Sequence, residues 1–286
     1  MECGSVLVVG AGGMAGADFV KCWPGAAGVD LPEADITDPE SCRRVVGGAR
    51  PRVVVNCAAA TGVDWCESNR DEAMQVNAEG AGNLAAGAAG VGALVVQLST
   101  DYVFDGASAG EYAEADAPKP LCVYASSKLE GEIAVRAATP NHLIVRVGWL
   151  FGHADKSFVR AMLRRAEDSE PVRVIDDQVG CPTYSYDIAG AIERLVDAGA
   201  TGTFHFTNAG ACTRLEMARY VFERAGLDTA RLAAIKSGEL RWVAKRPGRV
   251  VLSTAKYRGT TGAVRRHWHA AVEEALERDG VKITRV

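Results

Sequence analysis

The chain has 286 residues, with 32 Lys and Arg against 36 Asp and Glu and a formal net charge of −4. A nucleic-acid-binding protein normally carries a basic field, so we expect no nucleic-acid partner. The apolar runs are too short to cross a bilayer, and no signal peptide precedes the first apolar strand. We therefore expect a cytoplasmic protein with no membrane partner.

The cysteines indicate the redox environment of the protein. There are eight, Cys3 among them, scattered along the chain without a Cys-x-x-Cys pair. A chain of this length buries enough apolar surface without disulfide bonds. We therefore expect reduced thiols, several of them in the core.

The first half of the chain alternates short apolar strands with helical segments. Strands are predicted at residues 6–9, at a short run ending at residue 30, and at residues 53–55, 94–99 and 143–147. Helices are predicted at residues 14–23, from residue 38, and at residues 71–89 and 124–137. This alternation indicates parallel βαβ units, so the expected fold class is α/β with a Rossmann-type doubly wound parallel sheet.

The second half has a looser pattern. Helices are predicted at residues 157–168, 186–197, 213–225 and 267–278, and short strands at 172–175 and 203–206. We expect a dinucleotide-binding domain over residues 1–150 and a smaller mixed α/β substrate-binding lobe over residues 151–286, with parts of the later chain returning to the first domain. Since nothing resembles a flexible linker, the two parts should share an interface.

A glycine-rich turn follows the first strand and opens the first helix. Gly10 permits a tight turn, Gly13 lets the backbone approach a pyrophosphate, and Gly16 lets the helix pack close to the strand. Free N–H groups at a helix start favour an anion. The turn is therefore a candidate dinucleotide site, and the alternative is a glycine-rich turn without a ligand.

Asp30 bears on the choice of cofactor. It ends the second strand, where an acidic side chain can bind the adenosine ribose hydroxyls. Residues 25–41 contain no Lys or Arg to accept a 2′-phosphate. The sequence therefore favours NADH over NADPH, unless Asp30 is only a solvated turn residue.

Tyr124 and Lys128 are the most informative pair. Their spacing of four places both side chains on one helix face. Reduction of a carbonyl needs a proton donor at its oxygen, and a nearby ammonium lowers the tyrosine pKa strongly only where water is excluded. Thr100 ends the fourth strand at the edge where α/β sheets bind ligands, and Ser99 competes with it for the role of orienting the substrate carbonyl. The alternative is an ordinary amphipathic helix.

Further motifs accompany this pair in a specific order. They occupy residues 54–64, 99–106, 120–132, 146–152 and 177–183, followed by Arg246-Pro247 and Trp268. Together they resemble the extended short-chain dehydrogenase/reductase superfamily and, within it, the dTDP-4-dehydrorhamnose reductases, from Val6 to about Leu276. The resemblance implies hydride transfer from NAD(P)H to the C4 keto group of a nucleotide-linked 4-keto-6-deoxysugar, with dTDP-4-dehydro-L-rhamnose as the expected substrate. It also implies a place in dTDP-rhamnose biosynthesis for cell-surface polysaccharide.

The resemblance also implies site residues. Tyr124 would protonate the sugar oxygen, Lys128 would hold the nicotinamide ribose, and Thr100 would complete the catalytic set. The cofactor would contact Gly10, Gly12, Gly13, Met14, Asp30, Asp35, Ile36, Asn56, Ala58, Ala59, Ser99, Tyr124 and Lys128. The substrate would contact Thr61, Val63, Thr100, Asp101, Tyr102, Trp149, Gln178 and Arg246. The planar cation of Arg246 suits a diphosphate.

Several alternatives stay open. Departures from the family pattern at Ala60, Trp65-Cys66 and Ala125 border the expected site, so the exact sugar and cofactor are not fixed. An epimerase that retains NAD, a reductase that makes another deoxysugar, and a non-catalytic regulatory subunit all share this fold. The complete set of Thr100, Tyr124 and Lys128 favours an enzyme.

The sequence does not identify a metal site. The histidines are scattered, so no structural zinc is expected, and although Mg²⁺ is not excluded, no carboxylate cluster points to it. The expected assembly is a monomer or a homodimer.

Overall fold

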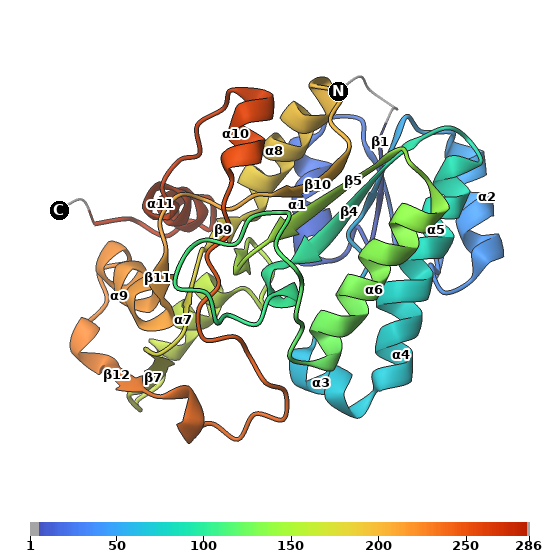
Figure 1. Ribbon diagram of the computed structural model, residues 1–286. Coiled ribbons are helices and arrows are strands. Elements are labelled where there is room, and N and C mark those ends of the chain that lie inside the picture. Colours follow the sequence, from blue (N-terminus) through green and yellow to red (C-terminus); the bar gives the residue numbers. More distant parts are fainter. Residues whose placement is uncertain (1–5, 285–286) are drawn as a thin grey trace.

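The computed structural model describes residues 6–284, with a six-stranded parallel sheet at its centre (Figure 1). The strands lie in the order β10-β5-β4-β3-β1-β2, and every neighbouring pair is parallel. They are β1 (Val6–Val9), β2 (Ala27–Val29), β3 (Val53–Asn56), β4 (Leu94–Thr100), β5 (His142–Val147) and β10 (Gly202–His205). The predicted Rossmann-type sheet is confirmed. The chain changes direction across the sheet at β1, and ligands bind outside the strand ends at such a switch point.

Alternate residues of β1 show how both faces of the sheet are covered. Val6 and Val8 pack into one core with α1 (Met14–Cys22), α8 (Ser185–Asp197) and α10 (Ala255–Thr261). Leu7 and Val9 pack into a second core with α2 (Pro39–Ala49), α5 (Gly80–Ala89) and α6 (Val123–Ala138). A strand that is buried on both faces reads as a continuous apolar run, which is why β1 and β3 were detectable in the sequence.

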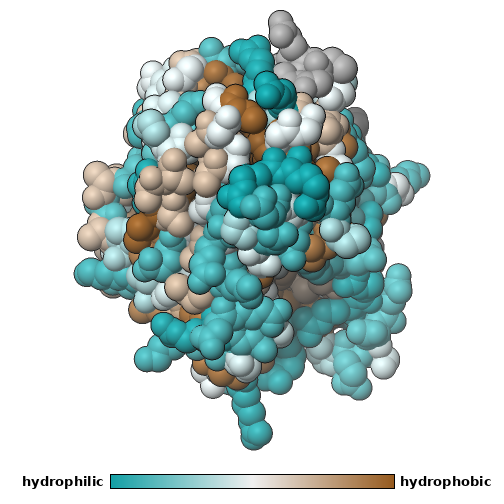
Figure 2. All heavy atoms as spheres, turned by 90° about the vertical axis from the view of Figure 1, so that its right-hand side faces the viewer, coloured by the Kyte–Doolittle hydropathy of each residue, from teal (hydrophilic) through white to brown (hydrophobic). Residues whose placement is uncertain are grey.

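The outer surface on the side of α2 and α5 is mainly hydrophilic. Apolar residues occur there in small groups among polar ones (Figure 2). These helices therefore turn their apolar faces to the sheet and their polar faces to solvent.

The long helix predicted at residues 71–89 is interrupted. It consists of α4 (Arg70–Met74), a π-helical turn η1 (Gln75–Glu79) and α5, and the short helix α3 (Val63–Ser68) precedes it. The π turn contains Asn77, whose side chain bonds both backbone groups of Ala60 in the loop after β3. A π turn inserts one residue per turn and often marks a functional position. The sequence pattern of this Ala-rich segment did not reveal it.

A second group of elements packs beside the sheet around its own apolar core. Phe151, Tyr184, Met217, Phe222 and Trp268 are among the core residues. The paired strands are β6 (Leu150–Phe151) with β9 (Thr183–Tyr184), β7 (Val172–Ile175) with β12 (Leu232–Ile235), and β8 (Val179–Gly180) with β11 (Cys212–Thr213). The helices of this group are α7 (Phe158–Arg165), α9 (Arg214–Arg224) and α11 (Trp268–Arg278), with short turns η3 (Thr229–Arg231) and η4 (Ser237–Glu239). A further short turn, η2 (Asp101–Val103), directly follows β4 of the central sheet.

The strand predicted at residues 203–206 belongs to the central sheet. As β10 it pairs in parallel with β5, and α8 packs against α1 on the same face. The later chain therefore passes from the second group of elements to the sheet and back, as the ribbon in Figure 1 shows.

Two further findings concern the cysteines and the helices. The seven cysteines within residues 6–284 are unpaired, and Cys3 lies outside the described residues. Over the same range, the helices are too short or too polar to traverse a lipid bilayer.

Candidate active site

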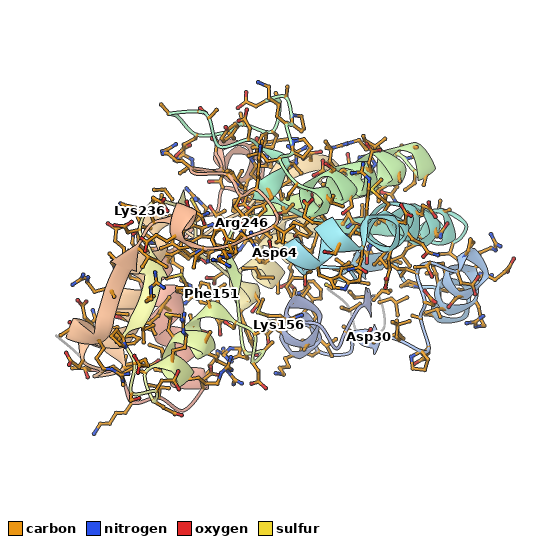
Figure 3. All side chains as sticks on the ribbon, turned by 90° about the horizontal axis from the view of Figure 1, so that it is seen from below. Asp30, Asp64, Phe151, Lys156, Lys236 and Arg246 are labelled. Atoms are coloured by element: carbon orange, nitrogen blue, oxygen red, sulfur yellow. The ribbon has the colours of Figure 1, made fainter. Side chains whose placement is uncertain are left out.

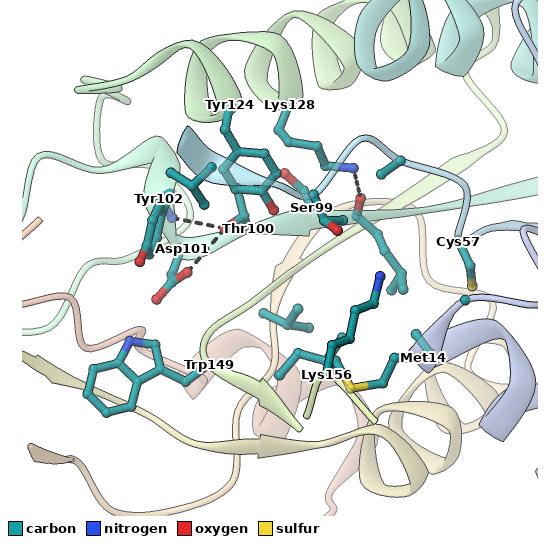
Figure 4. Close-up of a pocket in the computed structure, with 18 of the residues that line it drawn as sticks. Met14, Cys57, Ser99, Thr100, Asp101, Tyr102, Tyr124, Lys128, Trp149 and Lys156 are labelled. Carbon is teal, nitrogen blue, oxygen red and sulfur yellow. Dashed lines mark hydrogen bonds between the residues drawn. The ribbon is translucent and has the colours of Figure 1, made fainter. Parts of the chain in front are cut away.

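A cavity of about 390 Å³ lies at the carboxyl ends of β1, β3 and β4, the expected edge of the sheet. Figure 4 shows side chains from α6, the end of β4, the start of α1 and the segment after β5 meeting around it. The predicted site residues that line it are Gly13, Met14, Asn56, Ala59, Thr61, Val63, Ser99, Thr100, Asp101, Tyr102, Tyr124, Lys128 and Trp149. The chain therefore brings most of the predicted cofactor and substrate residues to one place.

The three predicted catalytic residues lie together on α6 and β4. The Thr100 hydroxyl lies beside the Tyr124 phenol in the cavity wall and acts to lower its pKa. It also donates to Asp101 Oδ1 at 3.2 Å and accepts the backbone N–H of Tyr102 at 3.2 Å. Lys128 Nζ donates to the carbonyl oxygen of Leu98 at 2.8 Å (Figure 4). A phenol, a hydroxyl and an ammonium therefore share one cavity wall.

Burial has the largest effect on the pKa values of Tyr124 and Lys128. It raises the pKa of Tyr124 above its ordinary value, with the Thr100 hydrogen bond opposing the shift. It lowers the pKa of Lys128 to about 8, against the attraction of Glu132. The sequence argument expected Lys128 to lower the pKa of the phenol, but in the free protein desolvation disfavours the charged form of each group more strongly. Tyr124 is therefore held as a neutral phenol, the form that can donate a proton.

Ser99 and Thr100 have different partners. Ser99 Oγ donates to Glu132 Oε1 at 2.6 Å, and Arg146 binds the same buried carboxylate through two nitrogens at 2.7 and 2.8 Å. The Ser99 hydroxyl is therefore already donated to Glu132, whereas the Thr100 hydroxyl lies beside Tyr124. This geometry favours Thr100 as the hydroxyl beside the reacting group.

A second cavity continues the first along the sheet edge and shares Gly13, Cys57 and Ala59 with it. Of the predicted cofactor residues, Gly10, Asp30, Asp35, Ile36 and Ala58 line this second cavity. The two cavities together form an elongated space, as a dinucleotide requires.

The glycine-rich turn passes a test of fit for a dinucleotide. Gly10 has φ +82°, and a Cβ there would lie 2.4 Å from the backbone nitrogen of Ala58. A Cβ on Gly12 would lie 2.7 Å from Asp30 Oδ2, which accepts the Gly12 N–H at 2.6 Å. Gly13 is the N-cap residue of α1 and has no side chain that could accept the free N–H groups of the first turn. The helix start is therefore left without a side-chain cap, as an anion-binding turn requires.

Two predicted substrate residues, Gln178 and Arg246, are outside the lining of both cavities. Gln178 is buried. Arg246 binds Asp64 through two nitrogens at 2.7 and 3.1 Å and stacks on the Trp242 ring at 3.9 Å (Figure 3). Its charge is therefore already paired in the free protein.

Two cations that the sequence argument did not select do line the first cavity. Arg214 begins α9 and stacks on the Trp149 ring at 3.6 Å, and Lys156 precedes α7. Neither belongs to a motif whose spacing points to a ligand. Only the fold brings them to the cavity, so the sequence carried no signal for them.

Asn77 was also missed. Its amide donates to Ser127 Oγ on α6 at 2.9 Å and to the Ala60 carbonyl oxygen at 3.0 Å. Asn77 thereby ties the loop after β3, which lines both cavities, to the helix that carries Tyr124 and Lys128.

Within residues 6–284, His, Cys, Asp and Glu side chains do not gather in groups of three or more that could hold an ion.

Comparison with known proteins gives consistent results. Residues 4–280 match the family model described as the RmlD substrate binding domain. The dTDP-4-dehydrorhamnose reductase of Mycobacterium tuberculosis is 39% identical over 282 residues, covering 95% of this chain and 92% of that protein. A dTDP-4-keto-6-deoxy-D-glucose reductase of Streptomyces niveus is 39% identical over 275 residues, covering 94% of this chain and 96% of that protein. A solved dTDP-4-dehydrorhamnose reductase of Bacillus anthracis in complex with NADP has a TM-score of 0.93 at 32% identity, covering 96% of this chain and 98% of that chain.

Proposed function

The chain belongs to the dTDP-4-dehydrorhamnose reductase family, and from this we propose that it reduces the C4 keto group of a nucleotide-linked 4-keto-6-deoxysugar with NAD(P)H. The expected reaction converts dTDP-4-dehydro-L-rhamnose to dTDP-L-rhamnose. One observation carries the proposal: a neutral, partly buried phenol lies beside Thr100 in a cavity that continues into a glycine-rich turn suited to a dinucleotide.

In this reaction the nicotinamide, when bound, supplies the hydride. The backbone N–H groups at the start of α1 hold the pyrophosphate, and Asp30 meets the adenosine ribose. Lys128 holds the second ribose, and its ammonium stabilises negative charge near the phenol. Thr100 orients the sugar carbonyl, and Tyr124 donates its proton to the C4 oxygen.

The assay follows the absorbance of NADH while the protein meets dTDP-4-keto-L-rhamnose. Tyr124→Phe is expected to lower turnover by roughly 10²- to 10⁴-fold, because it removes the proton donor, and to leave NADH binding nearly unchanged. Tyr220→Phe is the control, since Tyr220 bonds Glu273 away from both cavities. Turnover that survives in Tyr124→Phe contradicts the assignment of the phenol as the acid.

The relative from Streptomyces niveus supports a second candidate substrate. That protein is named a dTDP-4-keto-6-deoxy-D-glucose reductase and is as similar to this chain as the mycobacterial relative. Offering both keto sugars in parallel with NADH separates the two reductases. An epimerase would interconvert sugars without net loss of NADH.

We further propose that NADH is preferred over NADPH. The lining of the second cavity includes Asp30, Asp35 and Glu72 and, among the described residues, no Lys or Arg. A 2′-phosphate would therefore meet negative charge without a positive partner.

The double substitution Asp30→Ala with Leu31→Arg tests this preference. It is expected to shift the ratio of kcat/KM for NADH and NADPH toward NADPH by about tenfold or more, since it removes one like charge and adds one opposite charge. Glu33→Ala is the matched control, an exposed carboxylate of the same segment outside the cavity lining. A wild-type protein that strongly prefers NADPH would contradict the proposal.

A further inference from the structure

Asp101 carries a buried carboxyl that contacts the hydroxyl of the catalytic candidate Thr100. It is 3% exposed and still lines the first cavity. Its Oδ1 accepts the Thr100 hydroxyl at 3.2 Å (Figure 4). The same hydroxyl acts to lower the pKa of Tyr124, and all three residues line the first cavity, so the Thr100 hydroxyl lies between the carboxyl and the phenol. Within residues 6–284 this carboxyl forms no ion pair.

The groups that face Asp101 come from several elements. Arg214 begins α9, Tyr102 lies in η2, Tyr124 lies on α6, and Cys181 precedes β9. The backbone after β5 closes over the carboxyl, because a Cβ on Gly148 would lie 2.9 Å from Asp101 Oδ2. Water is thus largely excluded from Asp101, and the groups around it carry one positive charge, on Arg214.

This environment keeps the carboxyl close to its protonation midpoint. Burial raises the pKa of Asp101 to about 7, while the Thr100 hydrogen bond and the Arg214 charge oppose the shift. Near neutral pH Asp101 therefore holds a proton in a substantial share of molecules, unlike an ordinary aspartate.

We propose that Asp101 is the proton reservoir that restores the Tyr124 phenol, through the Thr100 hydroxyl, during the reduction. The inference rests on the reductase function proposed above. As the hydride reaches the sugar carbon, the Tyr124 O–H bond breaks and a new O–H bond forms on the sugar oxygen. The Thr100 hydroxyl proton passes to the Tyr124 oxygen, and the Asp101 carboxyl proton passes to the Thr100 oxygen. Tyr124 and Thr100 end unchanged, and Asp101 ends as a carboxylate that takes a proton from solvent before the next turnover.

The relay changes where the negative charge resides. Without it, a phenolate is left in a site where burial disfavours that form, and an ionised Asp101 nearby repels it. With the relay, the single negative charge ends on a carboxylate that faces the Arg214 guanidinium. The protonated form of Asp101 is therefore the working form, and activity falls as the pH rises through its pKa.

The first test needs neither cofactor nor substrate. The free wild-type protein is titrated between pH 5 and 9 by infrared spectroscopy, and the C=O stretch of its protonated carboxyls is followed. We expect a band that disappears around pH 7 in the wild type and is missing from Asp101→Asn. A wild-type protein without a carboxyl titrating in this range overturns the proposal.

The second test is kinetic. In the wild type, kcat/KM for the keto sugar should fall above about pH 7. Asp101→Asn keeps the hydrogen-bond acceptor but has no proton to give. We expect it to lower kcat/KM about tenfold at pH 6 and to remove the fall around pH 7, so that only the later fall from deprotonation of Lys128 around pH 8 remains, and to leave NADH affinity unchanged.

Asp105→Asn is the matched control, because it changes a carboxylate of the same turn that bonds Tyr112 outside the cavity. It should keep the wild-type pH profile. An Asp101→Asn protein whose activity still begins to fall around pH 7, at the same pH as the wild type, overturns the relay.

A second pair of variants covers the case in which Asp101→Asn does not fold. Thr100→Ser retains a hydroxyl between carboxyl and phenol and should retain the pH dependence, whereas Thr100→Val should lose it. A Thr100→Val protein with the wild-type profile contradicts the relay. If the wild type oxidises neither NADH nor NADPH with any 4-keto sugar, the proposed reductase function is wrong. If the wild type is active but Asp101→Asn has the same pH profile, only the relay is wrong.

Discussion

Arg214 is a partly buried cation that stacks on the Trp149 ring. Desolvation lowers its pKa, with Tyr102 and Asp101 opposing the shift, and the described part of the chain supplies no carboxylate within ion-pair distance. A desolvated charge is stabilised by an anion, and guanidinium matches phosphate oxygens in a fork. Because Arg246 is already bound to Asp64, we expect Arg214 rather than Arg246 to meet the diphosphate of the substrate.

This expectation can be tested by changing one side chain. Arg214→Met should raise the KM for the nucleotide sugar roughly ten- to 100-fold, the effect of losing charged hydrogen bonds of about 1.5–3 kcal/mol, and should leave NADH affinity unchanged. Arg219→Met on the exposed side of the same helix is the control. An unchanged KM in Arg214→Met excludes this residue as a diphosphate partner.

At the scale of elements, the short helix α3 joins three regions of the molecule. Val63 lines the first cavity and Trp65 lines the second. Between them, Asp64 accepts the backbone N–H groups of Val243 and Ala244 at 3.1 and 2.9 Å and binds the Arg246 guanidinium. Residues 242–246 are therefore held against the same helix that borders both cavities (Figure 3).

Asp64→Asn is expected to loosen this contact. The Arg246 hydrogen bond lowers the pKa of Asp64 to about 2, so the carboxylate stabilises the contact above its unfolded pKa and loses that effect only as the pH falls through about 2. Asp64 is 39% exposed, so solvent screening limits the pair to no more than about 1 kcal/mol. We expect a several-fold rise in the KM for both ligands and faster hydrogen exchange at residues 242–246.

Asp71→Asn, an exposed carboxylate at the start of α4, is the control for this change. Exchange at residues 242–246 that is as slow in Asp64→Asn as in the control would show that α3 does not hold the segment.

At the scale of the whole molecule, local sequence patterns predicted local structure well. Apolar runs predicted the buried strands β1, β3, β4 and β5. The capping signal predicted the start of α2, where Asp38 accepts the Glu40 N–H at 2.9 Å. The π turn at η1 escaped prediction, and its residue Asn77 contacts Ala60 in another segment, which no local pattern reports. Trp149 adopts φ 39°, which is rare for a residue with a side chain, and no sequence pattern indicates it.

The candidate site likewise contains residues that the sequence predicted and residues that it did not. The glycine-rich turn, Thr100, Tyr124 and Lys128 were found because their chemistry depends on short spacings within one segment. Arg214 and the Asp64–Arg246 pair depend on contacts between segments far apart in the sequence, so no local pattern reports them. The direction of the Tyr124 pKa shift differs from the sequence expectation for a related reason, since burial is set by the packing of the whole chain around the phenol.

The return of β10 to the central sheet affects how the protein is made. When β5 leaves the ribosome, the edge that β10 will cover has no partner until the intervening chain, including β6 to β9, has been synthesised. At a translation rate of about 5–20 residues per second, the nascent chain exposes this edge for several seconds. An uncovered strand edge can pair with other chains, so this interval is when the nascent protein depends most on protection by chaperones.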